Sequence, residues 1–308
     1  MKSKLMSMSE AVQKFVHDED LFYMGGFACR IIYSAIHEMV RQHKKDLIVC
    51  GAGGCAEEGD VAVAAGCVKK MMCPYWGLFE VGLSRVATRA INNGQVHVDD
   101  YTNLGAPFRV LAGAIGAPYV PVKEAFGSDL LKYADPNEAK VSEDPFTGEK
   151  VVLYRALNPD SCVVHAQQAD EYGNTQLFGL IAADDWGARA SDRVIVVVEK
   201  IVSREEIGSD PNRTLIPGDF VSAVVHEPYA AHPSGVTGYY KEDIEFRRMY
   251  ASMAKTEEGL RTFMDEWIYS IPDRETYIEK YVKKFGRERL DALRVKPLLT
   301  PPVNIGAY

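Results

Sequence analysis

The chain has 308 residues, of which 47% are hydrophobic and 25% charged, a composition typical of a globular protein with a large core. Its formal net charge is -8, which argues against a general nucleic-acid binder, because the phosphate backbone rewards concentrated Lys and Arg. No stretch approaches the roughly 20 apolar residues of a membrane helix, and residues 1–8 lack the apolar core of a secretory signal. We therefore expect a cytoplasmic protein that binds neither membranes nor nucleic acids.

The first fifty residues predict a βαβ unit. The expected elements are a helix over 10–16, a strand over 21–24, a helix over 32–39 and a strand over 47–50. The first strand ends at Gly25-Gly26-Phe27, where paired glycines allow positive φ or the close approach of a ligand to backbone amides. A plain turn between strand and helix is the alternative explanation.

The segment after the second strand carries glycines, cysteines and aromatic residues. Residues 50–54 lack the third glycine of a dinucleotide fingerprint, so no nucleotide cofactor is expected. Further on we expect a helix within 54–66 and a strand over 68–73. Cysteines stand at positions 50, 55, 67 and 73 without close pairing or a nearby histidine, so we interpret them as packed, reduced thiols and expect no metal site.

An aromatic run, Tyr75 to Phe79, follows the third strand and ends at Glu80. A carboxylate among aromatic side chains is a candidate general base, and an exposed carboxylate at a helix start is the alternative. Later we expect a helix over 104–115 and a strand over 118–122. The polar stretch 132–150, with its Asp-Pro-Phe-Thr-Gly turn, is interpreted as a surface excursion.

An apolar run that begins at Val163 turns polar after Val164 and contains His165, Gln167 and Gln168. The pattern predicts a buried strand that ends in a loop with turn residues up to Gly179. Ligands bind beyond the carboxyl ends of strands in open α/β sheets, so this loop is either part of a site or a capped turn.

The last part of the chain supplies more strands and then helices. We expect a helix over 184–190, a buried parallel strand over 193–199, a capping box at 203–206 and a strand over 220–226. His232, beside a proline, is a candidate to face the same crevice as His165. Two histidines without a positioned serine or cysteine make no triad, and structural hydrogen bonding is the alternative. Residues 242–294 predict two to four helices, followed by a proline-rich tail.

Several of these segments together resemble the alpha subunits of family I CoA-transferases, those of the glutaconate type most closely. The resemblance is carried by residues 25–27, 165–169, 199–203, 205–207, 210–211, 216–218, 231–234 and 238–240. It spans almost the whole chain, and the motifs follow in the family's order.

The resemblance implies a single α/β domain over 1–308, an open three-layer sandwich of the isomerase/CoA-transferase type. It has a mostly parallel sheet with helices on both faces and a helical C-terminal region. It also implies a homologous beta subunit, in a heterodimer that assembles to a higher oligomer. An acyl-CoA and a carboxylic acid are the implied substrates, with no bound cofactor. The nucleophilic glutamate, which carries CoA as a thioester, belongs to the beta subunit.

By the same resemblance, the Gly25-Gly26 amides should lie near the acyl or thioester oxygen. The expected substrate- and CoA-binding residues are Gly25, Gly26, Phe27, Arg30, Trp76, Leu78 and Phe79. The residues expected to structure the crevice are His165, Gln167, Gln168 and His232.

The chain departs from the glutaconate-type pattern where the aromatic run and the pair Ile31-Ile32 make the expected acyl wall bulky and apolar. A larger or less polar acyl group is therefore expected. Related proteins on this scaffold hydrolyse or decarboxylate acyl-CoA thioesters, and Glu80 would be the base in that alternative. A ligand-sensing domain of a regulator is a further alternative, which the lack of a basic DNA-binding helix pair disfavours.

Overall fold

The computed structural model describes residues 2–51 and 53–295. Its helices are α1 Met8–Phe15, α2 Tyr33–Arg41, α3 Glu57–Ala64, η1 Phe79–Val81, α4 Arg85–Asn92, α5 Gly105–Ala114, α6 Leu130–Tyr133, α7 Asp184–Ala190, α8 Arg204–Ser209, η2 Pro211–Arg213, η3 Gly218–Phe220, α9 Ile244–Met253, α10 Glu257–Met264, η4 Asp265–Tyr269, α11 Arg274–Phe285 and α12 Arg287–Leu293. Its strands are β1 Leu21–Met24, β2 Leu47–Cys50, β3 Val68–Cys73, β4 His97–Asp100, β5 Tyr119–Val122, β6 Ala139–Glu143, β7 Lys150–Arg155, β8 Ser161–Ala169, β9 Thr175–Gln176, β10 Arg193–Ile201, β11 Thr214–Ile216 and β12 Ala223–His226.

The central sheet is mostly parallel, as predicted. Its parallel strands follow the order β4-β3-β2-β1-β8-β10-β12, and the short strands β9 and β11 pair antiparallel beyond the end of β8. The middle strands β8 and β10 are buried along almost their whole length, and β10 contains the run Val-Ile-Val-Val-Val. Such continuous apolar runs are typical of parallel strands covered on both faces.

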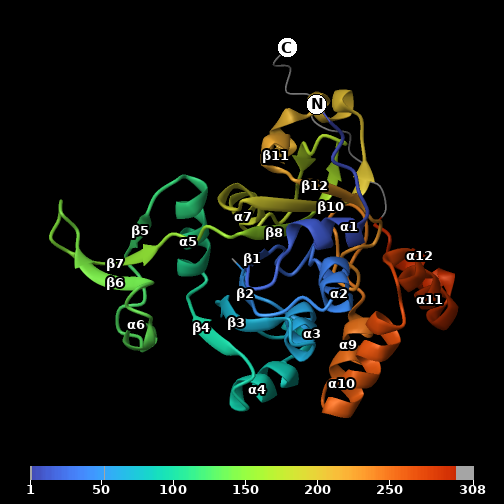
Figure 1. Cartoon of the computed structure of the whole chain (residues 1–308), viewed down its shortest axis with the longest axis horizontal. Helices are drawn as coiled ribbons and strands as arrows, with labels where there is room; N and C mark the ends of the chain where they lie inside the picture. The colour runs from blue at the N-terminus through green and yellow to red at the C-terminus, as the bar shows by residue number, and fades with distance from the viewer. Residues whose placement is uncertain (1, 52, 296–308) are drawn as a thin grey trace.

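Helices cover both faces of this sheet (Figure 1). Alternate residues of β8 point to opposite sides, so Val163 joins one core with α1, α2 and α3, while Val164 joins the other with α5 and α7. The three-layer α/β fold expected from the sequence is thereby confirmed.

The C-terminal helices α9 to α12 pack against the first of these cores and lie at one side of the molecule (Figure 1). Their aromatic side chains interlock, with Trp267 and Tyr281 fully buried around Phe246. The expectation of several helices over 242–294 is confirmed. The proline-rich tail falls on residues 296–308, outside the described residues.

A small three-stranded antiparallel sheet, in the order β5-β7-β6, extends from the opposite side (Figure 1). The predicted surface excursion over 132–150 is confirmed, since every residue of this stretch is exposed or half-buried, but the stretch also includes the end of α6 and the unexpected strand β6. The predicted turn is real and closes the β6–β7 hairpin, with the Gly148 amide donating to the carbonyl of Asp144.

Two further expectations concern the thiols and the membrane. The cysteines at 50, 55, 67 and 73 are free and buried, as expected. In the part of the chain that the structure describes, no helix is both long and apolar enough to cross a bilayer.

Candidate active site at the β1–β8 switch point

The strand order reverses between β1 and β8. From β1 the chain builds β2, β3 and β4 outward on one side, and then returns to place β8, β10 and β12 on the other. Open α/β sheets bind ligands at the carboxyl ends of the strands that flank such a reversal. Met24 ends β1 opposite Val163, and the loop Gly25–Arg30 begins at this point.

Glycine is required at the start of this loop. A Cβ on Gly25 would lie 2.6 Å from the carbonyl oxygen of Val163, and one on Gly26 would lie 2.6 Å from the carbonyl oxygen of Arg30. Gly26 also has φ +92°, which side chains disfavour. Ala28 and Arg30 adopt φ values of 56° and 55°, so the loop is held in an unusual backbone path.

The amides of the two glycines are already bonded within the chain. Gly25 N donates to the carbonyl of Val163 at 3.0 Å, and Gly26 N donates to Asp184 Oδ1 at 2.9 Å. This corrects the expectation that these amides face a thioester oxygen. Their hydrogen bonds instead fix the loop on β8 and on the start of α7.

Arg30 is fully buried and is held by the protein itself. Its Nη1 donates to the carbonyl of His165 at 2.7 Å and to Asp184 Oδ2 at 2.6 Å, while Nη2 donates to the carbonyls of Leu180 and Ile181. Sequence reasoning expected Arg30 to bind substrate. Its burial and its bonds to carbonyls and Asp184 correct that expectation, because they make it a clamp between the glycine loop, β8 and the segment before α7.

The expected aromatic wall lies next to the glycine loop. Phe27 meets Phe79 edge-to-face with ring centroids 5.8 Å apart, and Tyr75 lies 5.3 Å from Phe79. Phe27 also lies against Gly53, where an added Cβ would come within 2.4 Å of its ring. We call residues 75–79 the aromatic wall. The partly exposed rings of Tyr75 and Phe79 form one surface with Phe27 at the ends of β1, β2 and β3.

Two residues of this region do not face that surface. Leu78 is only 3% exposed and packs into the main core, so it supports the wall from behind. The side chain of Glu80 is 64% exposed, and its Oε2 lies 3.6 Å from Arg247 Nη1. The burial among aromatic rings that suggested Glu80 as a base is therefore not found.

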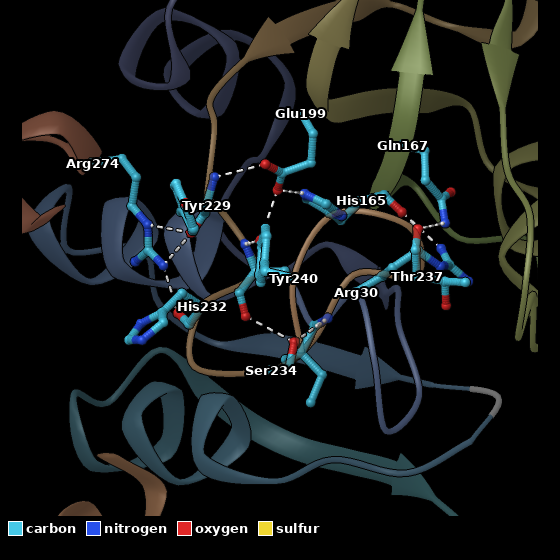
Figure 2. Close-up of polar contacts among 12 residues, drawn as sticks. Arg30, His165, Gln167, Glu199, Tyr229, His232, Ser234, Thr237, Tyr240 and Arg274 are labelled. Carbon is cyan, nitrogen blue, oxygen red and sulfur yellow. Dashed lines mark hydrogen bonds and ion pairs between the residues drawn. The ribbon is translucent and has the colours of Figure 1, made fainter. Parts of the chain in front are cut away.

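His165 bonds to a buried carboxylate. Its Nε2 lies 2.9 Å from Glu199 Oε1, which also accepts from Tyr240 Oη at 2.7 Å. The other carboxylate oxygen accepts from the amide of Tyr229 at 2.8 Å. Figure 2 shows how this network joins β8 and β10 to the loop that contains Tyr229 and Tyr240.

The two glutamines of β8 also bond to neighbouring loops. Gln167 Nε2 donates to the carbonyl of Phe178 at 2.8 Å. It also donates to the carbonyl of Thr237 at 3.3 Å (Figure 2). Gln168 Nε2 donates to Gln176 Oε1 at 2.7 Å. These contacts agree with side chains that hold the loops in place.

His232 is turned toward the C-terminal helices. Its Nδ1 lies 3.0 Å from Tyr277 Oη, and its Nε2 lies 3.3 Å from Asp243 Oδ2. Burial lowers the pKa of His232 to about 4 despite the bond to Asp243, so the ring is neutral at pH 7. This favours a structural part over that of a proton shuttle.

Sequence reasoning missed Asp184, which bonds both the Gly26 amide and Arg30. The available signal was an acidic residue directly after the apolar run Ile181-Ala-Ala. It also missed Asp60 and Arg247, which contact the aromatic wall. Asp60 belongs to the run Glu57-Glu58-Gly59-Asp60, which is buried within an Ala- and Val-rich helix.

Cavity volume alone does not identify the switch point as the functional site. A groove of about 800 Å³ lies between α1, α2 and α11, and its walls include Arg41, Glu227 and Arg274. None of its lining residues belongs to the glycine loop or the aromatic wall. The switch point is preferred because strand order, strained backbone and a partly exposed aromatic surface coincide there.

Sequence comparison assigns the family. A family model described as coenzyme A transferase matches residues 5–227. This chain belongs to that family. The matched region contains the whole central sheet of the CoA-transferase chain and ends at the start of the loop that leads to α9.

Known proteins resemble the CoA-transferase chain over most of its length. The A subunit of glutaconate CoA-transferase from Acidaminococcus fermentans is 34% identical over 96% of both chains, and the crystal structure of that enzyme matches with a TM-score of 0.89. The A subunit of 3-oxoadipate CoA-transferase from Pseudomonas knackmussii is 33% identical, over 88% of this chain and 95% of the relative. The structure of a variant of the decarboxylase AibA/AibB matches with a TM-score of 0.74 and 29% identity, over 86% of this chain and 100% of the other.

Proposed function

We propose that this chain is the alpha subunit of a heteromeric CoA-transferase that moves CoA between an acyl-CoA and a carboxylic acid. The observation that carries the proposal is the similarity to one subunit of glutaconate CoA-transferase, which extends over 96% of both chains in sequence and in structure. The name of that relative, and of the 3-oxoadipate relative, denotes one subunit of a larger enzyme. A homologous beta subunit is therefore the proposed partner.

The carboxylates nearest the glycine loop support a nucleophile on the partner. Both oxygens of Asp184 accept hydrogen bonds from the loop, and both oxygens of Glu199 accept from Tyr240 and Tyr229. Both side chains are buried. A nucleophilic carboxylate must reach the thioester carbonyl, so we place it on the beta subunit.

The proposed reaction uses that glutamate twice. It attacks the acyl-CoA carbonyl, the C–S bond breaks, and CoA leaves as a thiolate while an acyl-glutamyl anhydride remains. The thiolate then attacks the glutamyl carbonyl, releases the first acid as a carboxylate and leaves a glutamyl-CoA thioester. The second acid reverses these steps and departs as the new acyl-CoA. Each exchange is thereby divided into easier substitutions.

The present chain contributes part of the acyl pocket. We propose that Phe27 and the aromatic wall, with Trp76 and Phe79, contact the acyl group, and that Gly25 and Gly26 position this surface. Three aromatic rings in contact favour an apolar acyl group larger than a short dicarboxylate. The chain uses a coenzyme A thioester as substrate and needs no bound cofactor for this chemistry.

The test is a covalent trap. The chain is produced together with a homologous beta subunit, treated with an acyl-CoA and reduced with borohydride, which converts a glutamyl thioester to an alcohol. Mass spectrometry should find one modified glutamate, on the beta subunit. A modified glutamate on this chain, or no adduct in a complex that transfers CoA, would contradict the proposal.

A second candidate is favoured by the similarity to the AibA/AibB decarboxylase. In it the same complex hydrolyses or decarboxylates a bulky acyl-CoA, and Glu80 on η1, an exposed carboxylate that directly follows the wall, is the candidate base. Conversion of the thioester without any acceptor acid, and without a trapped adduct, would support this candidate over transfer.

A further inference from the structure

The aromatic wall is held from behind by two buried polar groups. One of these groups is the carboxyl of Asp60 on α3, and the other is the guanidinium of Arg247 on α9. Both side chains are at most 1% exposed. Each bonds to the chain segment that contains the wall, so the wall is not a free loop.

Asp60 connects Trp76 in the wall, and Ser84 shortly after the wall, to Tyr250 on α9. Its Oδ1 accepts from Trp76 Nε1 at 2.9 Å and from Ser84 Oγ at 2.5 Å. Its Oδ2 accepts from Tyr250 Oη at 2.9 Å. The indole of Trp76 is thus positioned through a carboxylate that Tyr250 itself holds.

Arg247 contacts the last two residues of the wall and Glu80, which follows them. Its Nη2 donates to the carbonyl of Leu78 at 3.3 Å, its guanidinium lies 5.7 Å from the Phe79 ring centroid, and its Nη1 lies 3.6 Å from Glu80 Oε2. Its Nε donates to Glu57 Oε1 at 2.7 Å, which anchors the guanidinium on α3.

The two supporting residues on α9, Arg247 and Tyr250, lie beyond the region that the family model matches. Arg247 and Tyr250 are three residues apart and face the same side of α9, and the family match ends at residue 227. The wall and Asp60 lie within residues 5–227, whereas Arg247 and Tyr250, which also hold the wall, belong to the C-terminal helical layer.

We propose that α9 sets the position of the aromatic wall, and through it the preference among acyl groups, with Arg247 and Tyr250 as positioning residues. The inference rests on the proposed function, because the wall is assigned there to the acyl pocket. The loss of one buried hydrogen bond that holds the wall should change the preference between acyl groups by about fivefold, the effect of roughly 1 kcal/mol.

The test compares Tyr250→Phe with Tyr281→Phe in the complex with the beta subunit. Both changes remove one buried tyrosine hydroxyl that donates to a carboxylate, but Tyr281 bonds to Asp243, away from the wall. The first measurement is acrylamide quenching of Trp76, obtained by subtracting the signal of matched variants with Trp76→Phe. The second is the ratio of kcat/KM for a short and for a bulky acyl-CoA.

We expect increased quenching and about a fivefold change of the ratio in Tyr250→Phe, with neither in Tyr281→Phe. Unchanged quenching in Tyr250→Phe, or equal changes in both variants, would overturn the inference. Altered quenching with an unchanged ratio would also overturn it, since the wall would then move without affecting specificity. If the wild-type complex binds no acyl-CoA, the proposed function itself fails, and quenching still shows whether α9 holds the wall.

Discussion

A few buried side chains hold the glycine loop at the switch point in place. The contact of Arg30 with Asp184 is the clearest case. Asp184 accepts from the Gly26 amide through one oxygen and from Arg30 through the other. Both residues are at most 1% exposed. A buried charge that loses its partner is strongly destabilising, so this pair controls whether the glycine loop forms.

Asp184→Ala should lower the free energy of unfolding by about 3–5 kcal/mol, because it leaves the buried Arg30 guanidinium without its counter-charge. The measurement is chemical denaturation followed by circular dichroism. The matched control is Asp185→Ala, since the adjacent acid takes no part in the Arg30 contacts. Equal losses in both variants would show that the pair is not what stabilises this region.

Asp60 predicts a dependence of stability on pH. Burial raises the pKa of this carboxyl to about 7, although Ser84, Tyr250 and Trp76 donate hydrogen bonds to it. An aspartate in an unfolded chain has a pKa of about 3.9, so between these values the folded state binds more protons. The stability that the protonated form contributes is complete below about pH 4 and is lost as the pH rises through about 7.

Asp60→Asn removes this titration. The free energy of unfolding of the wild type, minus that of the variant, should therefore fall as the pH is raised from about 5 to about 8. Urea denaturation at several pH values measures it, with the exposed Asp219→Asn as the control. A difference that stays constant or rises over this range would disprove the assignment.

At the scale of secondary-structure elements, the sequence predicts the strands and helices that have a strong hydrophobic pattern. The strand over 21–24 and the strand over 68–73 have the predicted bounds, and the buried runs of β8 and β10 were recognised from their β-branched residues. The clearest case is β10, where the run from Val194 to Val198 is buried on both faces and apolar without interruption.

Some of the elements that were missed are polar or exposed, although β7, which was also missed, buries Val151, Val152 and Tyr154. No strand was expected at β4 or β6, because β4 has no fully buried residue and β6 is mostly exposed. Their conformation depends on pairing with β3 and β7, which single-sequence periodicity does not report. The capping box at 203–206 was right in its first half, since Ser203 caps α8 through the Glu206 amide, whereas the Glu206 carboxylate bonds to Lys200.

His165 connects elements, and its replacement tests that connection. His165→Ala should lower the stability of the complex by about 2 kcal/mol or more, because it removes a buried hydrogen bond to Glu199 and leaves a cavity between β8 and β10. The kcat of the complex that remains intact should stay close to that of the wild type. Size-exclusion chromatography and thermal denaturation measure the assembly and stability of the complex, and steady-state kinetics measures its kcat.

The exposed His226 supplies the control for this experiment, since His226→Ala removes an imidazole without creating a cavity. A stable, fully assembled His165→Ala complex with a selectively reduced kcat would show that the imidazole takes part in the chemical step.

At the scale of the whole molecule, the fold and the family follow from the order of the motifs, but the candidate site follows only in part. The sequence assigns the glycine loop and the aromatic wall to one pocket, and Phe27 and Phe79 are in contact, while their part in substrate binding stays a prediction. The orientation of Arg30, of the two glycine amides and of Leu78 was not, because burial depends on segments far away in sequence, such as 180–184. The contribution of a partner chain lies outside the reach of any reading of one sequence.

The pairing of β1 with β8 has a consequence for how the molecule is made. Phe22 pairs with Ser161, so one edge of β1 has no native neighbour until the ribosome has synthesised more than half of the chain. An exposed apolar strand edge invites wrong pairing, and contacts between distant residues form slowly. Until β8 is made, the emerging segment from β1 to β4, which ends at Asp100, therefore exposes a strand edge and is prone to wrong pairing.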